Sequence, residues 1–220
     1  MLKRCFDLFL SVCLLLLLSP VLIALALAIR ATSRGPAFFY QLRTGRDLRP
    51  FFIAKFRTMA ADVGGPAFTL AEDPRVTPFG SWLRRSKLDE LPQLWNILRG
   101  EMSFVGPRPI LPELTHCDRH AYRQLYRVRP GLTDPASLKY AEESRLLQHV
   151  ENPERYFHEV IARDKLCLSI EYQRSATLTT DMRILVRTLL VCHRAAVSNF
   201  LGQCFAWLGQ LARRATAEQQ

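Results

Sequence analysis

The hydrophobic pattern is dominated by one uncharged, apolar run from Leu10 to Ile29. About twenty predominantly apolar residues are enough for a straight helix to cross a bilayer. Basic residues flank the run on both sides, with Lys3 and Arg4 before it and several arginines after it. Because positive charge favours the cytoplasmic side, both ends of this segment are predicted to prefer the same face of a membrane.

Ser19 and Pro20 interrupt the run near its middle. Proline removes a backbone donor and clashes with the preceding turn, so a kink is expected there, and a nearby serine hydroxyl can satisfy a freed backbone group. A re-entrant, Ser-Pro-broken helix over residues 1–33 accounts for both observations. Two alternatives stay open: an ordinary span with a tolerated proline, and a signal peptide, whose apolar core is usually shorter, about 7–15 residues.

Beyond the run, short segments are separated by glycine and proline turn signals, for example at residues 34–36 and 64–66. The stretch from Phe51 to Met59 is predicted to be a short strand or an irregular basic segment. Past Glu142 the pattern is mostly helical. The predicted fold is therefore mainly α with a small β or irregular element, and re-entry of the apolar run would make the chain a monotopic membrane protein.

The distal pattern places apolar and basic residues together from Arg183 to Arg194 and again from Ser198 to Ala215. Such segments are typical of interfacial amphipathic helices that lie on anionic membrane lipid, although a packed pair of soluble helices fits the same pattern. We predict one domain over residues 34–193, on the cytoplasmic face with interfacial helices, and an amphipathic C-terminal extension over residues 194–220.

Charge narrows the choice of partner. The 220 residues include 30 Lys and Arg against 20 Asp and Glu, a formal net charge of +10, which points to an anionic partner. Aromatic residues interleave with Lys55 and Arg57, as in nucleic-acid stacking surfaces. Their closeness to the apolar run favours a phosphate-bearing substrate and lipid instead, so no nucleic-acid partner is predicted. No oligomeric state is predicted.

The most informative local pattern lies between residues 86 and 98. Four apolar residues at helical spacing predict one buried stripe: Leu88, Leu91, Trp95 and Leu98. Pro92 is tolerated only in a first turn, so the helix is predicted to begin near Asp89. Asp89 and Glu90 then lie at the positive end of the helix, where acidic residues either cap the helix or take part in a site.

Arginines around this segment favour the second interpretation. Arg84 lies one turn upstream, and two prolines stiffen the loop around Arg108 in the stretch 106–109. Arg129 lies in a similar Arg-Pro-Gly stretch, which restrains the arginine less strongly. Because the planar fork of arginine suits phosphate oxygens, a rigid arginine near two carboxylates indicates phosphoryl chemistry.

Taken in order, these motifs resemble the bacterial sugar transferases, the monotopic phosphoglycosyl transferases. The resemblance runs from about Lys3 to Leu190 and is carried by KFRTM, LDELPQLWN, MSFVGPRP and RVRPGLTD. It implies a re-entrant membrane helix and transfer of a sugar-1-phosphate from a UDP-sugar to polyprenyl (undecaprenyl) phosphate, with release of UMP. It further implies the first membrane step of bacterial glycan synthesis, at the cytoplasmic face of the inner membrane.

The resemblance also implies roles for individual residues. Asp89 would be the nucleophile that forms a phospho-aspartate intermediate, and Glu90 would help to bind Mg²⁺. Lys55, Arg57, Arg84 and Arg108 match basic positions of the family and are candidates for holding phosphate groups, to which Arg129 is added.

Two departures from the family pattern bear on activity. Residues 134–140 read DPASLKY where many members continue with glycine and tryptophan, which leaves the identity of the sugar open. Ser169 stands where many members have aspartate. A lost carboxylate there keeps a catalytically inactive membrane-surface scaffold as an alternative. A transferase that moves only the sugar is another, and it would release UDP instead of UMP.

Overall fold

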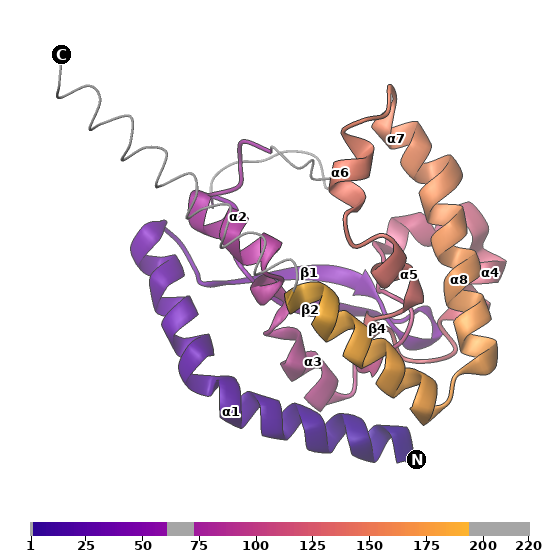
Figure 1. Ribbon diagram of the computed structural model, residues 1–220, viewed down its shortest axis with the longest axis horizontal. Helices are drawn as coiled ribbons and strands as arrows, with labels where there is room; N and C mark the ends of the chain where they lie inside the picture. The colour runs from indigo at the N-terminus through magenta and orange to yellow at the C-terminus, as the bar shows by residue number, and fades with distance from the viewer. Residues whose placement is uncertain (1, 61–72, 194–220) are drawn as a thin grey trace.

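A computed structural model describes residues 2–60 and 73–193, and in this part of the chain helices dominate (Figure 1). The strands form two small sheets, β1 with β2 and β3 with β4. The prediction of a mainly helical protein with a small β element is confirmed. The predicted C-terminal extension over residues 194–220 lies outside the described residues.

Helix α1 (Leu2–Thr32) contains the apolar run, with Pro20 inside it. It is long and apolar enough to cross a membrane. Figure 1 shows that α1 bends in its middle part and continues as a helix beyond the bend. The Ser19 hydroxyl donates to the Leu16 carbonyl at 2.8 Å. This carbonyl is the one that an N–H at position 20 would reach, so the predicted kink and the predicted help from Ser19 are confirmed.

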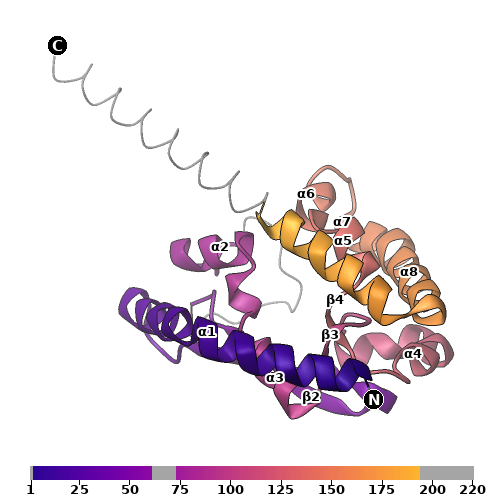
Figure 2. The same cartoon turned by 60° about the horizontal axis from the view of Figure 1, so that its bottom comes forward.

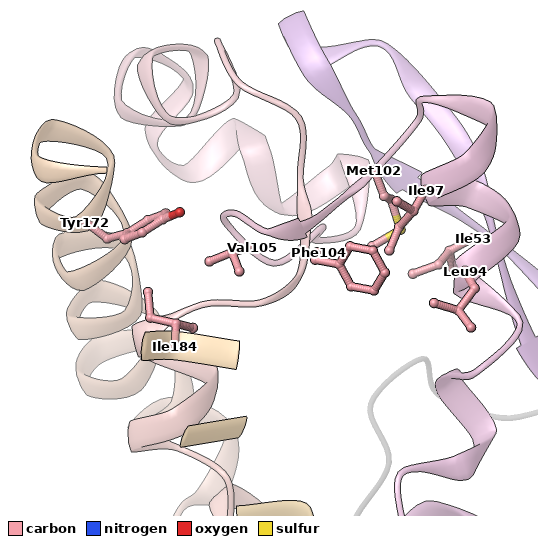
Figure 3. Packing of buried hydrophobic residues seen from close by; sticks show 8 residues of the cluster. All are labelled: Ile53, Leu94, Ile97, Met102, Phe104, Val105, Tyr172 and Ile184. Carbon is pink, nitrogen blue, oxygen red and sulfur yellow. The ribbon is translucent and has the colours of Figure 1, made fainter. Parts of the chain in front are cut away.

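Both halves of α1 pack along the rest of the molecule. Side chains of its first half pack against a core formed by eight buried residues (Figure 3): Ile53, Leu94, Ile97, Met102, Phe104, Val105, Tyr172 and Ile184. Its second half contributes Leu25 and Ile29 to another cluster, with Phe56 and Leu83. Other side chains of α1 remain exposed, Leu17 by 72% and Leu27 by 63%. One side of the helix is therefore anchored, while another is left apolar and uncovered.

Strands β1 (Phe38–Thr44) and β2 (Pro50–Phe56) form an antiparallel hairpin, joined through the short helix η1 (Arg46–Leu48). The predicted strand after Phe51 is thus β2. On its outer edge, the Asn96 side chain accepts from Ala54 N at 2.9 Å and donates to the Phe52 carbonyl at 2.8 Å. Asn96 belongs to α3 (Gln93–Arg99), so this amide fixes α3 against the hairpin.

Between the hairpin and α3 lie α2 (Pro78–Arg85) and the 3₁₀ turn η2 (Leu88–Glu90). The predicted buried stripe is wrong at Trp95, which is 53% exposed, whereas Leu94 and Ile97 are buried. The reason is that residues 88–98 are not one helix. Pro92 is the N-cap of α3, and the tighter 3₁₀ turn before it shifts the phase of the pattern.

Strands β3 (Ser103–Val105) and β4 (Gly131–Thr133) pair in parallel. A Cβ atom on Gly131 would lie 2.1 Å from the Gly106 nitrogen, so only glycine allows this approach. The Gly-Pro-Arg-Pro stretch and the Arg-Pro-Gly stretch therefore lie against each other. This contact fixes the start of the loop that carries Arg108.

The distal part is helical, as predicted. It comprises η3 (Pro112–Asp118), α4 (Arg119–Leu125), α5 (Pro135–Lys139), α6 (Glu143–Leu147), α7 (Pro153–Tyr156), η4 (Phe157–Ile161) and α8 (Ala162–Ser175). A further helix spans residues 178–193 and lies beside α5 and α8 (Figure 2). On this last helix Ile184 is buried, whereas Val186 and Leu189 are exposed by 56% and 70%. Its contact with lipid stays a prediction.

Candidate functional site

The two acidic residues of η2 differ in their surroundings. Lys87 precedes them in a left-handed conformation, with φ of 58°. Asp89 is 8% exposed, and its carboxylate accepts no hydrogen bond from residues 2–60 or 73–193. Neither η2 nor α3 has a side-chain cap, so the capping interpretation of Asp89 and Glu90 is wrong. Within the described part of the chain, Asp89 is thus a buried carboxylate that no hydrogen bond holds in place.

Glu90, in contrast, is held by two cations from distant parts of the chain. The Lys55 ammonium of β2 lies 3.3 Å from Glu90 Oε1. The Arg108 guanidinium binds both carboxylate oxygens, with Nη1 donating to Oε2 at 3.1 Å and Nη2 donating to Oε1. Arg108 Nη1 also donates to the Leu132 carbonyl of β4 at 3.2 Å. A bidentate pair of this kind fixes both partners in orientation as well as in position.

The electrostatics separate the two carboxyl groups. Burial opposes ionisation of Glu90, but the charges of Arg108 and Lys55 outweigh it and hold the Glu90 pKa well below its usual range. The charge of Glu90 in turn raises the pKa of Arg108. Burial, and then the adjacent charge of Glu90, raise the pKa of Asp89. The ionised Asp89 carboxylate is thus poorly stabilised by the protein, a condition that favours its reaction with an electrophile.

Arg84 completes the basic surroundings of Asp89. Its Nε donates to the Thr58 hydroxyl at 2.8 Å, which directs the side chain of α2 towards the end of the hairpin. The charges of Lys55, Lys87 and Arg84 all act to lower the pKa of Asp89. The structure therefore brings Lys55, Arg84 and Arg108 close to the acidic pair, and their contact with phosphate stays a prediction.

Arg57 and Arg129 lie elsewhere. Arg57 is buried and donates to the Ser33 carbonyl at 2.9 Å and to the Arg34 carbonyl, just beyond the end of α1. Arg129 Nε donates to the Gly100 carbonyl at 2.7 Å, at the end of α3. Both arginines satisfy backbone carbonyls at helix ends, and these contacts do not bring them to Glu90. Their predicted contact with phosphate stays a prediction that the geometry does not favour.

Arg43 is a basic residue near this site that the sequence interpretation missed. It lies on β1, where the Thr44 nitrogen donates to the Ile110 carbonyl at 2.8 Å, two residues after Arg108. In the sequence it is one of several arginines that follow the apolar run, and no local signal sets it apart from them. Only the pairing of the hairpin with the Arg108 loop distinguishes it from the exposed Arg46 and Arg49.

Ser169, the apparent loss of a carboxylate, has a defined partner. Its hydroxyl donates to Asp134 Oδ2 at 2.7 Å, and both residues are buried. Asp134 Oδ1 accepts from the Ser137 nitrogen at 2.7 Å and from the Ser137 hydroxyl at 2.6 Å, which caps α5. Position 134 already supplies one buried carboxylate, so a hydroxyl donor is the matching group at position 169.

The residues present fit a magnesium ion in part. The described residues contain no group of three or more His, Cys, Asp or Glu side chains arranged to hold a metal. Mg²⁺ is nevertheless often bound by one or two carboxylates, with water and substrate phosphates supplying the other ligands. Asp89 and Glu90 provide oxygen donors of that type, although Glu90 is shared with Lys55 and Arg108.

Three features define the site: a buried carboxylate that accepts no hydrogen bond from the described residues, a second carboxylate fixed by two cations, and a long apolar helix that packs beside η2. Comparison with known proteins gives the family. The profile of the family described as bacterial sugar transferase matches residues 1–195, and the chain belongs to this family.

Three relatives illustrate the similarity. The chain is 41% identical over 200 residues to an undecaprenyl-phosphate glucose phosphotransferase of Komagataeibacter xylinus (85% of this chain, 35% of the relative). It is 35% identical over 206 residues to the exopolysaccharide production protein PSS of Rhizobium leguminosarum bv. phaseoli (86% and 94%). It is 37% identical over 201 residues to a UDP-glucose:undecaprenyl-phosphate glucose-1-phosphate transferase of Escherichia coli K12 (86% and 39%). The chain thus spans less than half of the first and third relatives and most of the second.

Proposed function

We propose that this protein transfers a sugar-1-phosphate from a UDP-sugar to polyprenyl phosphate through a phospho-aspartate intermediate on Asp89. The observation that carries the proposal is the contrast within the acidic pair. Asp89 is buried and free of hydrogen bonds from the described residues, whereas Glu90 is fixed by Lys55 and Arg108. A nucleophile needs a free electron pair, and the charge of transferred phosphate needs fixed cations around it.

The chemistry balances in two steps. In the first, an Asp89 carboxylate oxygen attacks the β-phosphorus of the UDP-sugar, and the bond to the bridging oxygen breaks so that UMP leaves. In the second, a phosphate oxygen of the polyprenyl phosphate attacks the same phosphorus, and Asp89 leaves as a carboxylate. Lys55, Arg84 and Arg108 neutralise phosphoryl charge during both steps.

The proposal includes Mg²⁺, held by Glu90 together with substrate phosphate oxygens. When bound, the ion would withdraw electron density from the phosphoryl oxygens. Arg108 and Lys55 keep Glu90 ionised at neutral pH, and an ionised carboxylate is the form that binds a cation. The ionised state of Glu90 is the property that supports the proposed metal site.

We also propose that α1 enters and leaves the membrane by the cytoplasmic face. A straight helix of this length would separate its two ends by roughly 45 Å. Both ends of α1 contact the same body of the protein. Arg4 donates to the Ile97 and Leu98 carbonyls at 2.7 and 3.0 Å, and Lys3 donates to the Val105 carbonyl at 2.9 Å and pairs with Asp181. Arg57 holds the residues after α1 on that body.

Re-entry makes Pro20 testable. Replacing it in the variant Pro20→Ala restores a backbone N–H for the Leu16 carbonyl, so the helix is expected to straighten and the N-terminus to cross the membrane. The readout is the fraction of N-terminal tags that an impermeant reagent reaches from outside intact inner-membrane vesicles of known orientation. Ser19→Ala, which leaves the proline in place, is the matched control. A tag that stays on the cytoplasmic side in Pro20→Ala would contradict the role given to the proline.

The reaction is tested by the nucleotide that leaves. Purified protein in detergent, given polyprenyl phosphate, Mg²⁺ and a panel of UDP-sugars, is expected to release UMP. UDP-glucose is the first donor to test because two of the three relatives described above carry glucose in their names. Release of UDP would identify a transferase that moves only the sugar. If folded protein released neither UMP nor UDP with any donor of the panel, the catalytically inactive scaffold would be favoured.

The proposed place of the reaction follows from its substrates. Polyprenyl phosphate is a membrane lipid, and one relative is named for exopolysaccharide production. We propose that the protein acts at the cytoplasmic face of a bacterial inner membrane, in the first membrane step of a glycan pathway. The exposed apolar face of α1 and the formal charge of +10 are the properties that support contact with anionic lipid.

A further inference from the structure

Two basic residues of the hairpin formed by β1 and β2 lie on the same face of it. Residues paired across an antiparallel hairpin share a face, as do residues two apart along a strand. The register pairs Phe39 with Lys55, Gln41 with Ile53, and Arg43 with Phe51. Arg43 therefore lies on the same face as Lys55, whose ammonium contacts Glu90.

The loop that carries Arg108 runs next to this end of the hairpin. The Thr44 nitrogen donates to the Ile110 carbonyl at 2.8 Å, and the Tyr126 hydroxyl donates to the Arg108 carbonyl at 2.7 Å. The Tyr126 hydroxyl in turn accepts from the Ile110 nitrogen at 3.3 Å. The first bond holds the loop against β1 next to Arg43, and the two bonds of Tyr126 fix the conformation of residues 108–110. Burial, and then the nearby charge of Arg108, lower the pKa of Arg43 to about 10.

Some N–H groups of the Arg43 guanidinium have no acceptor among the described residues. Its Nε and Nη2 donate to the Gln41 side-chain oxygen at 3.1 and 2.6 Å. The rest of the described chain supplies no other hydrogen bond and no ion pair to this guanidinium. A guanidinium carries five N–H groups, and the neutral Gln41 amide binds through Nε and Nη2 alone without supplying a negative charge. Two arginines thus lie close together, and Glu90 is already shared between Arg108 and Lys55.

We propose that Arg43, oriented by Gln41, binds a phosphate oxygen of a substrate alongside Arg108. This inference rests on the proposed function and extends it to a residue of the hairpin. The phosphate belongs either to the diphosphate of the sugar donor or to the acceptor lipid. Both present the same oxygens to a guanidinium fork, and kinetics separates the two sources.

The test is steady-state kinetics of Arg43→Ala with each substrate varied in turn. Loss of a charge-assisted contact is expected to raise one KM by about tenfold to hundredfold. A rise in the donor KM assigns Arg43 to the diphosphate, and a rise in the acceptor KM assigns it to the lipid phosphate. Arg43→Lys is expected to recover part of the loss. Arg49→Ala, an equal change of charge at an exposed position of the same hairpin, is expected to behave as wild type.

Gln41 supplies a test that a purely structural role would fail. Gln41→Glu keeps a hydrogen-bond acceptor for Arg43 but neutralises the charge of the arginine. The KM of this variant for the affected substrate is therefore expected to rise as far as that of Arg43→Ala. Gln41→Ala leaves the charge intact and is expected to have a smaller effect. Wild-type KM values for both substrates in Arg43→Ala would overturn the proposal.

Direct binding keeps this result separate from the fate of the proposed reaction. In the Asp89→Asn background, calorimetric titration with UDP and with a short-chain polyprenyl phosphate measures binding without turnover. Arg43→Ala is expected to weaken binding of one probe by about tenfold or more. Unchanged binding of both probes would overturn the role of Arg43 even if the wild type released UMP. Weakened binding of one probe, together with a wild-type protein that releases no UMP, would support Arg43 and contradict the proposed reaction.

Discussion

Asp89→Asn is expected to reduce UMP release by roughly 10⁴–10⁶-fold, because an amide cannot act as the nucleophile and nothing nearby replaces it. Glu90, the other carboxylate of η2, is bound at both oxygens by Arg108 and also contacts Lys55. It is therefore a poor substitute. The measurement is UMP formed per enzyme under saturating donor, with detection low enough to quantify a single turnover.

The fold is expected to survive this substitution. Asp89 accepts no hydrogen bond from the described residues, so an amide of the same shape breaks no contact there. Burial also disfavours the ionised form of Asp89, and a neutral amide removes that cost. Asp89→Asn is therefore expected to melt at or above the wild-type temperature. Activity within tenfold of wild type would rule out Asp89 as the nucleophile.

Ser169→Asp, which introduces the residue found in many family members, is expected to destabilise this protein. It would place a second carboxylate against the buried Asp134, whose oxygens already have three donors, one of them the Ser169 hydroxyl. An uncompensated buried charge costs about 3–5 kcal/mol. For a chain of this size the melting temperature would fall by roughly 6–20 °C.

The exchange of both residues isolates the cause. Asp134→Ser combined with Ser169→Asp restores one carboxylate and one hydroxyl, and it is expected to recover most of the lost stability. Ser169→Ala, which removes only the donor, is expected to cost about 1–2 kcal/mol. If Ser169→Asp melted like the wild type, the pairing of these two positions would not be the reason for the serine.

The bend of α1 and the position of the acidic pair were predictable because their signals are local. Ser19 and Pro20 act on the backbone of their own helix, and the acidic pair of η2 lies within one motif together with its preceding arginine. Contacts between distant segments were harder to predict. Arginine is a residue type that often binds phosphate, which made Arg57 and Arg129 candidates. Their side chains instead donate to backbone carbonyls at helix ends.

Arg43 illustrates the converse. Its sequence neighbourhood resembles that of Arg46 and Arg49, and only the register of β1 with β2 and the bond from Thr44 to Ile110 place it beside Arg108. The sequence left the effect of Ser169 open, because its partner, 35 residues earlier, could not be inferred from a single sequence. Trp95 was misplaced because a 3₁₀ turn and a proline interrupt what looks like one helical period.

The central claim is that the sugar-phosphate becomes covalently attached to Asp89 before the acceptor lipid takes part. The most direct measurement is mass spectrometry of protein that has been mixed with its UDP-sugar and Mg²⁺, without polyprenyl phosphate, and quenched in acid. The account predicts one sugar-phosphate added per protein, mapped to the peptide containing Asp89, together with an equal amount of UMP. An unmodified protein that releases UMP only after polyprenyl phosphate is added would contradict it and indicate direct transfer between the two substrates.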